Sequence, residues 1–101
     1  MPSHQLIVTA EAELDLAEGF CWYQEQALLG AAFIFAVGKQ FEHIASFPFA
    51  CPVIAHDVRR AVVKRYPYNI YYSVNSQFVD VLAVWHGSRD QERLLATRLG
   101  Q

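Results

Sequence analysis

The sequence predicts an α+β fold in which a small antiparallel sheet packs on a helical hairpin, in the order β-α-α-β-β-β. Two observations predict it. Apolar residues recur with the helical period before residue 46, whereas β-branched and aromatic residues dominate after residue 57. In addition, Asn75 and Ser76 separate two β-rich runs, and such a short polar turn is typical of a β-hairpin.

The N-terminal part begins with a short apolar run, Gln5–Val8, which favours a first strand. Thr9 then offers a hydroxyl group that caps a helix, and Glu11 and Glu13 lie in the first turn, where the helix dipole favours acids. Helix-forming residues continue to about Gln26. We expect the acids on one side of this helix and, on the other, an apolar stripe of two rows: Leu14, Ala17 and Cys21, and beside them Leu16, Phe20 and Tyr23.

A second helix is expected after a break near residues 27–30, and it runs to about Ser46. Its large apolar residues are spaced by four, four and three positions, which predicts one buried stripe: Phe33, Val37, Phe41 and Ile44. Pro48 and Pro52 end this helix, so residues 46–53 are expected to form a loop. Because few residues join the two helices, they are expected to form an antiparallel αα-hairpin.

The second half contains three strand-like runs, over residues 57–64, 68–74 and 78–86, and a short helix is expected over 90–99. In the last strand, alternation places four apolar residues on one face: Val79, Val81, Ala83 and Trp85. Both faces of the sheet are largely apolar, but two helices cover only one of them. We therefore expect the other face to be covered by a partner segment, a second copy or the chain's own C-terminal residues.

Composition indicates one domain over residues 1–101 and excludes several classes of protein. The chain is 53% hydrophobic and 18% charged, which is too apolar for a disordered chain. Its two cysteines are too few for a disulfide scaffold, and neither they nor the four histidines have metal-ligand spacing, so we expect no metal and no cofactor. The uncharged run over residues 26–38 is too short to span a bilayer, and no basic-then-apolar leader opens the sequence. We expect a cytoplasmic protein.

Charge is divided along the chain. Residues 1–57 contain seven acids and one base, whereas residues 58–101 contain seven bases and three acids, and the net charge is −2. Such a division presents a basic region to an anionic partner, or it is a dipolar surface that has no partner. The overall balance argues against strong non-specific binding of nucleic acid.

Three segments resemble the toxins of bacterial type II toxin–antitoxin modules: VTAEAELDLAEGFCWYQEQ, VRRAVVKRYPYNIYYSV and VLAVWHGSRD. The resemblance is to the ParE/RelE superfamily, on the side whose members are called plasmid stabilisation proteins, and it covers roughly residues 5 to 90. It is most specific where a basic strand leads into an aromatic-Pro-Tyr-x-Ile-Tyr-Tyr run and an apolar strand ends in His-Gly-x-Arg. The fold of this superfamily is the one predicted above.

The resemblance implies a cognate antitoxin, whose C-terminal segment wraps the toxin and holds it inactive in a hetero-oligomer. It also implies one of two targets, because ParE-like members poison DNA gyrase and RelE-like members cleave mRNA in the ribosome. The RelE-like reaction is attack of a 2′-OH on the adjacent phosphate, which needs a base, an acid and cations. The chain has few bases near its hairpin and no tyrosine after Tyr72, where an acid/base often lies in RelE-like members. We therefore favour inhibition of DNA gyrase over cleavage of mRNA, and a toxin-like module that only binds antitoxin is a third possibility.

Candidate site residues follow from the same motifs. The residues expected to contact a target or the antitoxin are Arg59, Arg60, Arg65, Trp85 and Arg89. For an RNase, His86 would transfer protons, and Arg60, Lys64 and Arg89 would supply charge. The structural alternatives are that the strand arginines pair with Asp57 or the acidic helix, that His86 bonds to the backbone, and that the tyrosine row is sheet core rather than a base-stacking platform.

Overall fold

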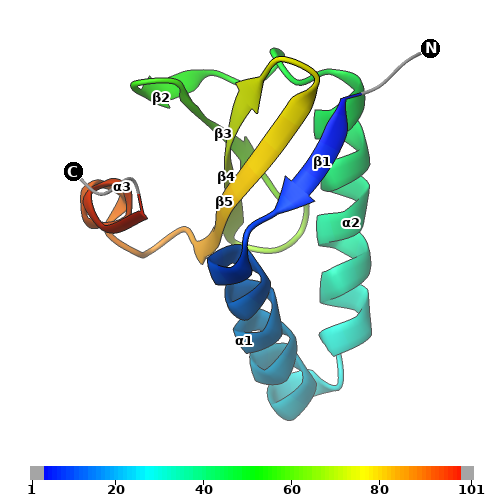
Figure 1. The fold of residues 1–101 in the computed structure, drawn as a ribbon. Coiled ribbons are helices and arrows are strands. Elements are labelled where there is room, and N and C mark those ends of the chain that lie inside the picture. Colours follow the sequence, from blue (N-terminus) through cyan, green and yellow to red (C-terminus); the bar gives the residue numbers. More distant parts are fainter. Residues whose placement is uncertain (1–3, 99–101) are drawn as a thin grey trace.

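The computed structural model describes residues 4–98, in which a five-stranded sheet lies between a helical hairpin and a single short helix (Figure 1). The elements in chain order are β1 (Gln5–Val8), α1 (Ala10–Ala27), α2 (Gly30–Ser46), β2 (Val53–Ala55), β3 (Val58–Val62), β4 (Tyr68–Asn75), β5 (Phe78–His86) and α3 (Gln91–Arg98). α1 and α2 pack on one face of the sheet, and α3 packs on the other. The predicted α+β class and helical hairpin are confirmed.

The strands lie in the order β1-β5-β4-β3-β2. β3, β4 and β5 pair antiparallel, but β1 runs parallel to β5, with Gln5 opposite Phe78 and Val8 opposite Val81. The sheet is therefore mixed, whereas the sequence predicted an antiparallel one. Alternation shows that a run is a strand, but it does not show the direction of its neighbour.

Two local features differ from the sequence prediction. The expected loop over residues 46–53 is present over residues 47–52, but it leads into an unpredicted short edge strand, β2, which pairs with β3 at two positions, Val53 with Arg59 and Ala55 with Val58. The hairpin turn lies one residue later than predicted, because Asn75 still pairs with Phe78. Ser76, at a φ of 55°, takes the left-handed conformation that the turn requires.

Side chains at both ends of α1 fix its position. The hydroxyl of Thr9 accepts from the Ala12 N–H and donates to the carbonyl of Val81 in β5, so it caps the helix and ties it to the sheet. Where α1 crosses α2, Gly19 leaves room for a ring, because a Cβ there would lie 2.6 Å from Phe33. The two helices therefore approach more closely than any larger residue at this position would allow.

The main core forms between this hairpin and the sheet, and its members are nearly or fully buried: Ala12, Phe33, Val37, Ile44, Ala61, Val63, Ile70, Tyr72, Val79, Val81 and Val84. The predicted stripe of the second helix is confirmed, with Phe41 partly buried beside it. Of the predicted stripe of the first helix, Leu16 and Tyr23 are partly buried against the core. The row of Leu14, Ala17 and Cys21 is wrong, since Leu14 is 66% exposed and the other two are exposed as well. Ala12, Asp15 and Gly19 are buried instead, because only small or paired side chains fit where α1 is this close to its neighbours.

A β-bulge at Leu82 changes which residues of β5 share a face. Tyr71 pairs with Ala83 and Tyr72 pairs with Val81, so Leu82 is an extra residue in the strand. Val81 therefore faces the hairpin, whereas Ala83 and Trp85 face α3. The prediction that all four alternating residues of β5 share one face is wrong, because a bulge shifts the alternation by one residue.

The second face of the sheet is partly covered by α3. Leu94 is 1% exposed and packs in a small cluster with Val58, Tyr71 and Ala83. Of the three covers predicted for this face, the chain's own C-terminal residues are therefore one that the fold uses (Figure 1). Helix α3 ends at Arg98, and the expected last residue of this helix, Leu99, lies outside the described residues.

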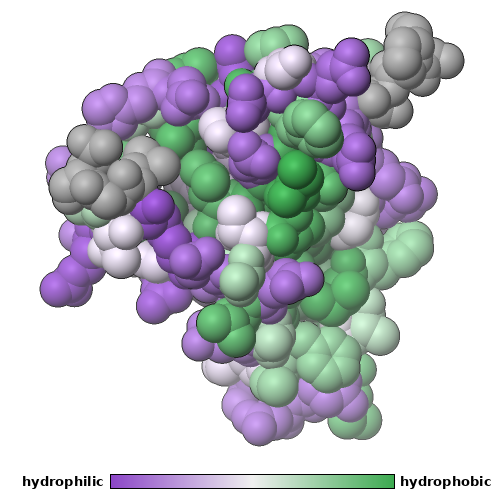
Figure 2. Space-filling model, in the orientation of Figure 1, coloured by the Kyte–Doolittle hydropathy of each residue, from purple (hydrophilic) through white to green (hydrophobic). Residues whose placement is uncertain are grey.

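Apolar side chains remain on the surface of the face that carries β1 and along the hairpin (Figure 2). Ile7 and Phe78, which lie on the two neighbouring strands, are about two-fifths exposed, and Leu28 at the tip of the hairpin is 79% exposed. Large contiguous patches of exposed apolar side chains are typical of sites that contact another molecule. None of the helices within residues 4–98 combines the length and apolarity needed to cross a bilayer.

Candidate functional site

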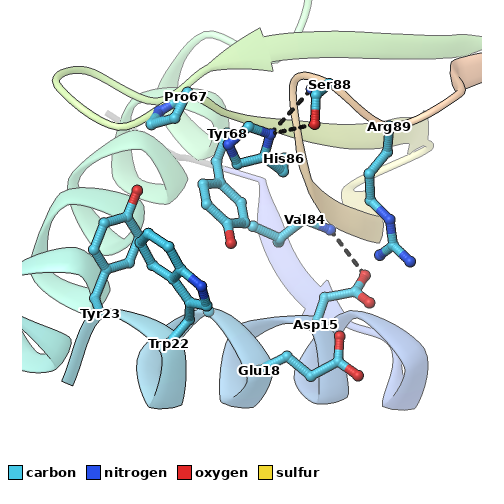
Figure 3. A pocket seen from close by; sticks show the side chains of 11 residues that line it. Asp15, Glu18, Trp22, Tyr23, Pro67, Tyr68, Val84, His86, Ser88 and Arg89 are labelled. Atoms are coloured by element: carbon cyan, nitrogen blue, oxygen red, sulfur yellow. Dashed lines mark hydrogen bonds between the residues drawn. The ribbon is translucent and has the colours of Figure 1, made fainter. Parts of the chain in front are cut away.

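A cavity of about 460 Å³ opens between α1 and the end of β5 (Figure 3). Three parts of the chain line it, and together they supply Asp15, Glu18, Gly19, Trp22 and Tyr23 from α1, Pro67 and Tyr68 at the start of β4, and Val84, His86, Ser88 and Arg89 from β5 and the loop that follows. The cavity lies here because β1 stops pairing at Val81. Beyond that point α1, rather than a strand, runs along the edge of β5.

Asp15 connects α1 to β5 and to α3. Its carboxylate is 6% exposed and accepts a hydrogen bond from the Val84 N–H at 3.1 Å. The guanidinium of Arg98 binds both carboxylate oxygens, at 3.0 and 3.1 Å, and also donates to the carbonyl of Leu82 at 2.7 Å. A buried carboxylate with a bidentate arginine and a backbone donor is fully paired, so Asp15 is a structural clamp between α1, β5 and α3.

One wall of the cavity is aromatic. The rings of Tyr23 and Tyr68 lie 6.1 Å apart, Trp22 stands edge-on to Tyr23 at 5.0 Å, and His86 stands edge-on to Tyr68 at 5.3 Å. Tyr23 is also stacked on Phe33 in the core at 5.0 Å, so the wall continues the packing of the hairpin. Trp22 is 55% exposed, which leaves its ring available at the mouth of the cavity.

The orientation of His86 is set by the residue two positions later. Its Nδ1 accepts from the Ser88 N–H at 3.1 Å and lies 2.8 Å from the Ser88 hydroxyl. Because a backbone N–H can only donate, Nδ1 carries no proton in the neutral ring, and the proton is on Nε2. The predicted alternative, a strand-end histidine bonded to backbone, describes this contact correctly.

Arg89 lies over an aromatic ring at the rim. Its guanidinium carbon is 4.1 Å from the centre of the Trp85 ring, and the guanidinium of Arg98 is 5.6 Å from the same ring. Cation–π contacts at this range restrain a long side chain that would otherwise move freely. Trp85 itself is half-buried, and within the described part of the chain its Nε1 has no hydrogen-bond partner.

Charges of both signs act on the cavity. Burial raises the pKa of Tyr68 above its ordinary value; Arg89 opposes this rise, and Glu18 and Asp15 add to it. The site therefore combines an aromatic wall, one exposed cation at the rim and one exposed carboxylate on α1, Glu18, since Asp15 is buried and paired with Arg98. Such a mixed site suits a protein surface or a side chain better than the phosphate of a nucleic acid, which carboxylates repel.

The family model described as the ParE toxin of the type II toxin–antitoxin system parDE matches residues 6–91. The chain belongs to the ParE toxin family. The resemblance to the ParE/RelE superfamily is thereby confirmed, on the ParE side. The match ends at the first residue of α3, so the helix that supplies Arg98 lies almost wholly outside the part that defines the family.

A solved chain of the chromosomal ParDE TA system from P. aeruginosa has a similar fold. The TM-score is 0.75 at 15% sequence identity, over 85% of this chain and 98% of that chain. At this identity the likeness shows the fold that the two chains share. No curated protein sequence matches this member of the ParE family.

In this ParE-family chain, the predicted site residues lie in four different places. His86 and Arg89 line the cavity, and the ring of Trp85 packs against the guanidinium of Arg89. Arg60 lies on the α3 face, where it donates to the Gln91 side chain at 2.8 Å. Lys64 and Arg65 line a second groove against α2.

Arg59 points to the hairpin side of the sheet. Its guanidinium donates to the carbonyls of Phe49 and Cys51 and lies over the Phe49 ring at 5.2 Å. The predicted pairing of the strand arginines with Asp57 or the acidic helix is therefore wrong. The loop before β2 and the start of α3 supply backbone and amide oxygens that lie closer.

Sequence reasoning missed Asp15, Trp22 and Tyr68 as members of one site. The signal for Asp15 was its place between two small residues, since Ala12, Asp15 and Gly19 follow the helical spacing of three and four. Within residues 4–98 there is no group of three side chains placed to ligate a metal ion.

Proposed function

We propose that this ParE-family toxin inhibits DNA gyrase in the bacterial cytoplasm and is held inactive by an antitoxin made with it, as expected of a plasmid stabilisation module. The toxin would act by binding, with no bond made or broken by its own residues. This proposal keeps the preference reached from the sequence and rests on a separate, geometric argument.

The observation that carries it is the separation of the four residues expected in an RNase. Cleavage by a 2′-OH needs a base, an acid and cations around one phosphate. Only His86 and Arg89 share a cavity, while Arg60 lies on the opposite face of the sheet and Lys64 lies beside α2. This separation supports a binding function over cleavage of RNA.

The cavity rim is suited to binding a protein. Arg89 is held over Trp85, so little side-chain entropy is lost when it contacts an acidic group of a target. Trp22 adds an exposed aromatic ring at the same mouth. Tryptophan and arginine are the residues that most often dominate the binding energy of a protein interface.

An antitoxin partner is supported by the family and by the apolar surface that the fold leaves open. Ile7 and Phe78 form part of this surface on the α3 side of the sheet, beyond the reach of the small cluster around Leu94. A segment of antitoxin that covers these side chains would remove them from water and stabilise the toxin by mass action.

The test is a supercoiling assay with purified chain, DNA gyrase, relaxed plasmid and ATP. We expect the wild-type chain to inhibit supercoiling and Arg89→Ala to inhibit at least about tenfold less, because a central interface arginine contributes roughly 1.4 kcal/mol or more. Arg93→Ala, an exposed arginine on α3, is the matched control and should inhibit like wild type.

A parallel assay with translating ribosomes separates the alternatives. Cleaved mRNA that disappears in His86→Ala, with normal supercoiling by gyrase, would overturn the proposal in favour of an RNase. Normal supercoiling and intact mRNA, with normal growth of cells that express the chain alone, would leave a module that only binds antitoxin.

A further inference from the structure

Two charged side chains at the cavity between α1 and β5 lack a partner of opposite charge. Glu18 is exposed on α1, and within residues 4–98 no cation lies within ion-pair distance of its carboxylate. Arg89 is exposed on the loop after β5, and its guanidinium lies over the Trp85 ring instead of beside a carboxylate. Both side chains line the cavity (Figure 3), but in the described part of the chain they form no ion pair with each other.

The other carboxylate at the cavity is already occupied. Asp15 is 6% exposed, and the guanidinium of Arg98 binds both of its oxygens. The charge of Asp15 is therefore offset inside the clamp. Of the two carboxylates that line the cavity, Glu18 is the one that a ligand can reach.

An open aromatic ring lies beside the Glu18 carboxylate. Glu18 and Trp22 are four positions apart on α1, so their side chains are neighbours on one face of the helix. Trp22 is 55% exposed, which leaves much of its indole ring open at the mouth of the cavity. A carboxylate next to an open indole is suited to a cation, because the carboxylate offers an ion pair and the indole is the aromatic ring that attracts cations most strongly.

The hydroxyl of Tyr68 lies between the two charges and is affected by both. Burial raises the pKa of Tyr68, Arg89 lowers it, and the carboxylates of α1 raise it. Carboxylates that raise the pKa of a phenol oppose a negative charge there and favour a positive one. The α1 side of the cavity therefore favours a cation, whereas the rim beside Arg89 favours an anion.

We propose that the cavity binds an arginine side chain of the protein target, held between the Glu18 carboxylate and the Trp22 ring. A guanidinium fits this site better than an ammonium, because it can stack on an aromatic ring and pair with a carboxylate at the same time. An acidic residue beside that arginine on the target would meet Arg89. A cavity of about 460 Å³ is in the range that buries a ligand of this size.

Two other kinds of ligand suit the cavity less well. A nucleotide that stacked its base on the aromatic wall would bring its phosphate near Glu18 as well as Arg89, and a carboxylate repels a phosphate. A purely apolar ligand would cover the Glu18 carboxylate without giving it a partner, which is costly. An arginine next to an acid satisfies both charges. The identity of the target rests on the proposed function, whereas the cation site itself does not.

The first experiment is an NMR titration of the isotope-labelled full chain with acetyl-arginine amide. The chain has two tryptophans, so it gives two indole N–H signals, and Trp22→Leu assigns the one that is expected to shift. Acetyl-citrulline amide has nearly the same shape without the charge, and should bind at least about threefold more weakly. Glu18→Gln should remove most of this preference, because it keeps the size of the side chain and removes its charge.

Two further variants serve as control and second test. Glu13→Gln removes the same charge from the same helix, but Glu13 lies about 140° round α1 from Glu18, and this variant should bind the arginine probe like wild type. Trp22→Leu keeps an apolar side chain and removes the aromatic face, so it should weaken binding at least about twofold, measured on the Val84 amide. Glu18 and Trp22 are both exposed, so neither substitution should unfold the chain.

A supercoiling assay then connects the site with the target. We expect Glu18→Gln to inhibit DNA gyrase at least about fivefold less than wild type, and Glu13→Gln to inhibit equally. Equal binding of the arginine and citrulline probes by wild type would overturn the cation site whatever gyrase does, as would tighter binding of adenosine 5′-monophosphate. Selective binding of the arginine probe, with undiminished inhibition by Glu18→Gln, would overturn the role of a target arginine. Selective binding by a wild-type chain that leaves gyrase unaffected would confirm the cation site and contradict the proposed function alone.

Discussion

The two faces of the sheet are held by different kinds of interaction. On the hairpin face, Phe33 is fully buried, with its ring centre 5.0 Å from that of Tyr23, 5.5 Å from that of Tyr66 and 4.9 Å from that of Tyr68. On the other face, α3 buries one large side chain, Leu94.

Polar contacts attach α3 at its first and last residues. Arg98 pairs with Asp15 on α1, and Gln91 accepts from Arg60 on β3. In a close-packed core, both smaller and larger side chains lower the stability of the whole fold, whereas single polar contacts can be lost locally. The hairpin face therefore sets the stability of the fold, whereas α3 is a separately attached cover that lies almost wholly outside the family match.

The largest expected effect comes from the hairpin face. Phe33→Ala should lower the free energy of unfolding by about 3–5 kcal/mol, because it leaves a cavity among three tyrosines that cannot collapse into it. Urea denaturation measures this. Phe35→Ala, an exposed phenylalanine two residues later on α2, is the control and should change stability by less than about 0.5 kcal/mol. Equal effects of the two variants would break the contrast between the faces.

The next effect tests the clamp that attaches α3. Asp15→Ala leaves Arg98, which is 17% exposed, without its carboxylate and the Val84 N–H without an acceptor, so it should cost about 3 kcal/mol. Asp15→Asn keeps an acceptor oxygen for Val84 and should cost about half as much. Hydrogen exchange should rise more in α3 than in α2. A uniform rise would show that α3 is not separately attached.

Alkaline pH tests the burial of a tyrosine on the hairpin face. Burial raises the pKa of Tyr72 well above its ordinary value near 10, and the neighbouring Cys51 adds to the rise, while Arg59 opposes it. The unfolded chain therefore ionises first, so stability is complete below pH 10 and falls as the pH rises above it, by up to about 1.4 kcal/mol per pH unit for this group.

The matched variant is Tyr72→Phe. It should reduce this alkaline loss and cost about 1 kcal/mol at neutral pH, because the Pro48 carbonyl loses its donor at 2.8 Å. A part of the loss should persist, since burial also raises the pKa values of Tyr23 and Tyr68. Urea denaturation at pH 8 and pH 11 checks both statements, and an unchanged alkaline slope in the variant would contradict them.

The smallest expected effect is on the α3 face. Gln91→Ala removes the acceptor of Arg60 and should cost about 0.5–1 kcal/mol. Limited proteolysis within α3 should speed up by a few-fold with little change in global unfolding. Glu92→Ala, which is exposed on the same helix, is the control and should be cleaved like wild type.

The sequence was sufficient for the elements of the fold because its periods are strong. Phe33, Val37 and Ile44 mark the buried side of α2, and the three long strands begin and end close to where alternation places them. The bulge at Leu82 could not be predicted, because one inserted residue leaves local composition unchanged but reverses the faces after it. The parallel pairing of β1 with β5 was also out of reach, since it depends on contacts across most of the chain.

The candidate site was predicted only in part for a related reason. His86 and Arg89 belong to a motif that can be read along the chain, and both line the cavity. Asp15 looks like one more acid on an acidic helix, and its role depends on Arg98, which lies 83 residues later. A pattern within one helix shows which side is small, but not which distant side chain will neutralise a carboxylate there.

Because β1 pairs with β5, the first strand cannot join the sheet until the last strand has been synthesised. Gln5 leaves the ribosome long before its partner Phe78, and at about 5–20 residues per second the interval is roughly 4–15 seconds. Through that interval Leu6 and Val8 have no sheet to join, and pairings between distant residues are slow to form even when the chain is complete. The edge of β5 that borders the cavity is assembled in the same late step. A newly translated molecule therefore passes through a period in which most of the polypeptide is made but its binding surface is not yet formed. This delay follows from the pairing of the first strand with the last one.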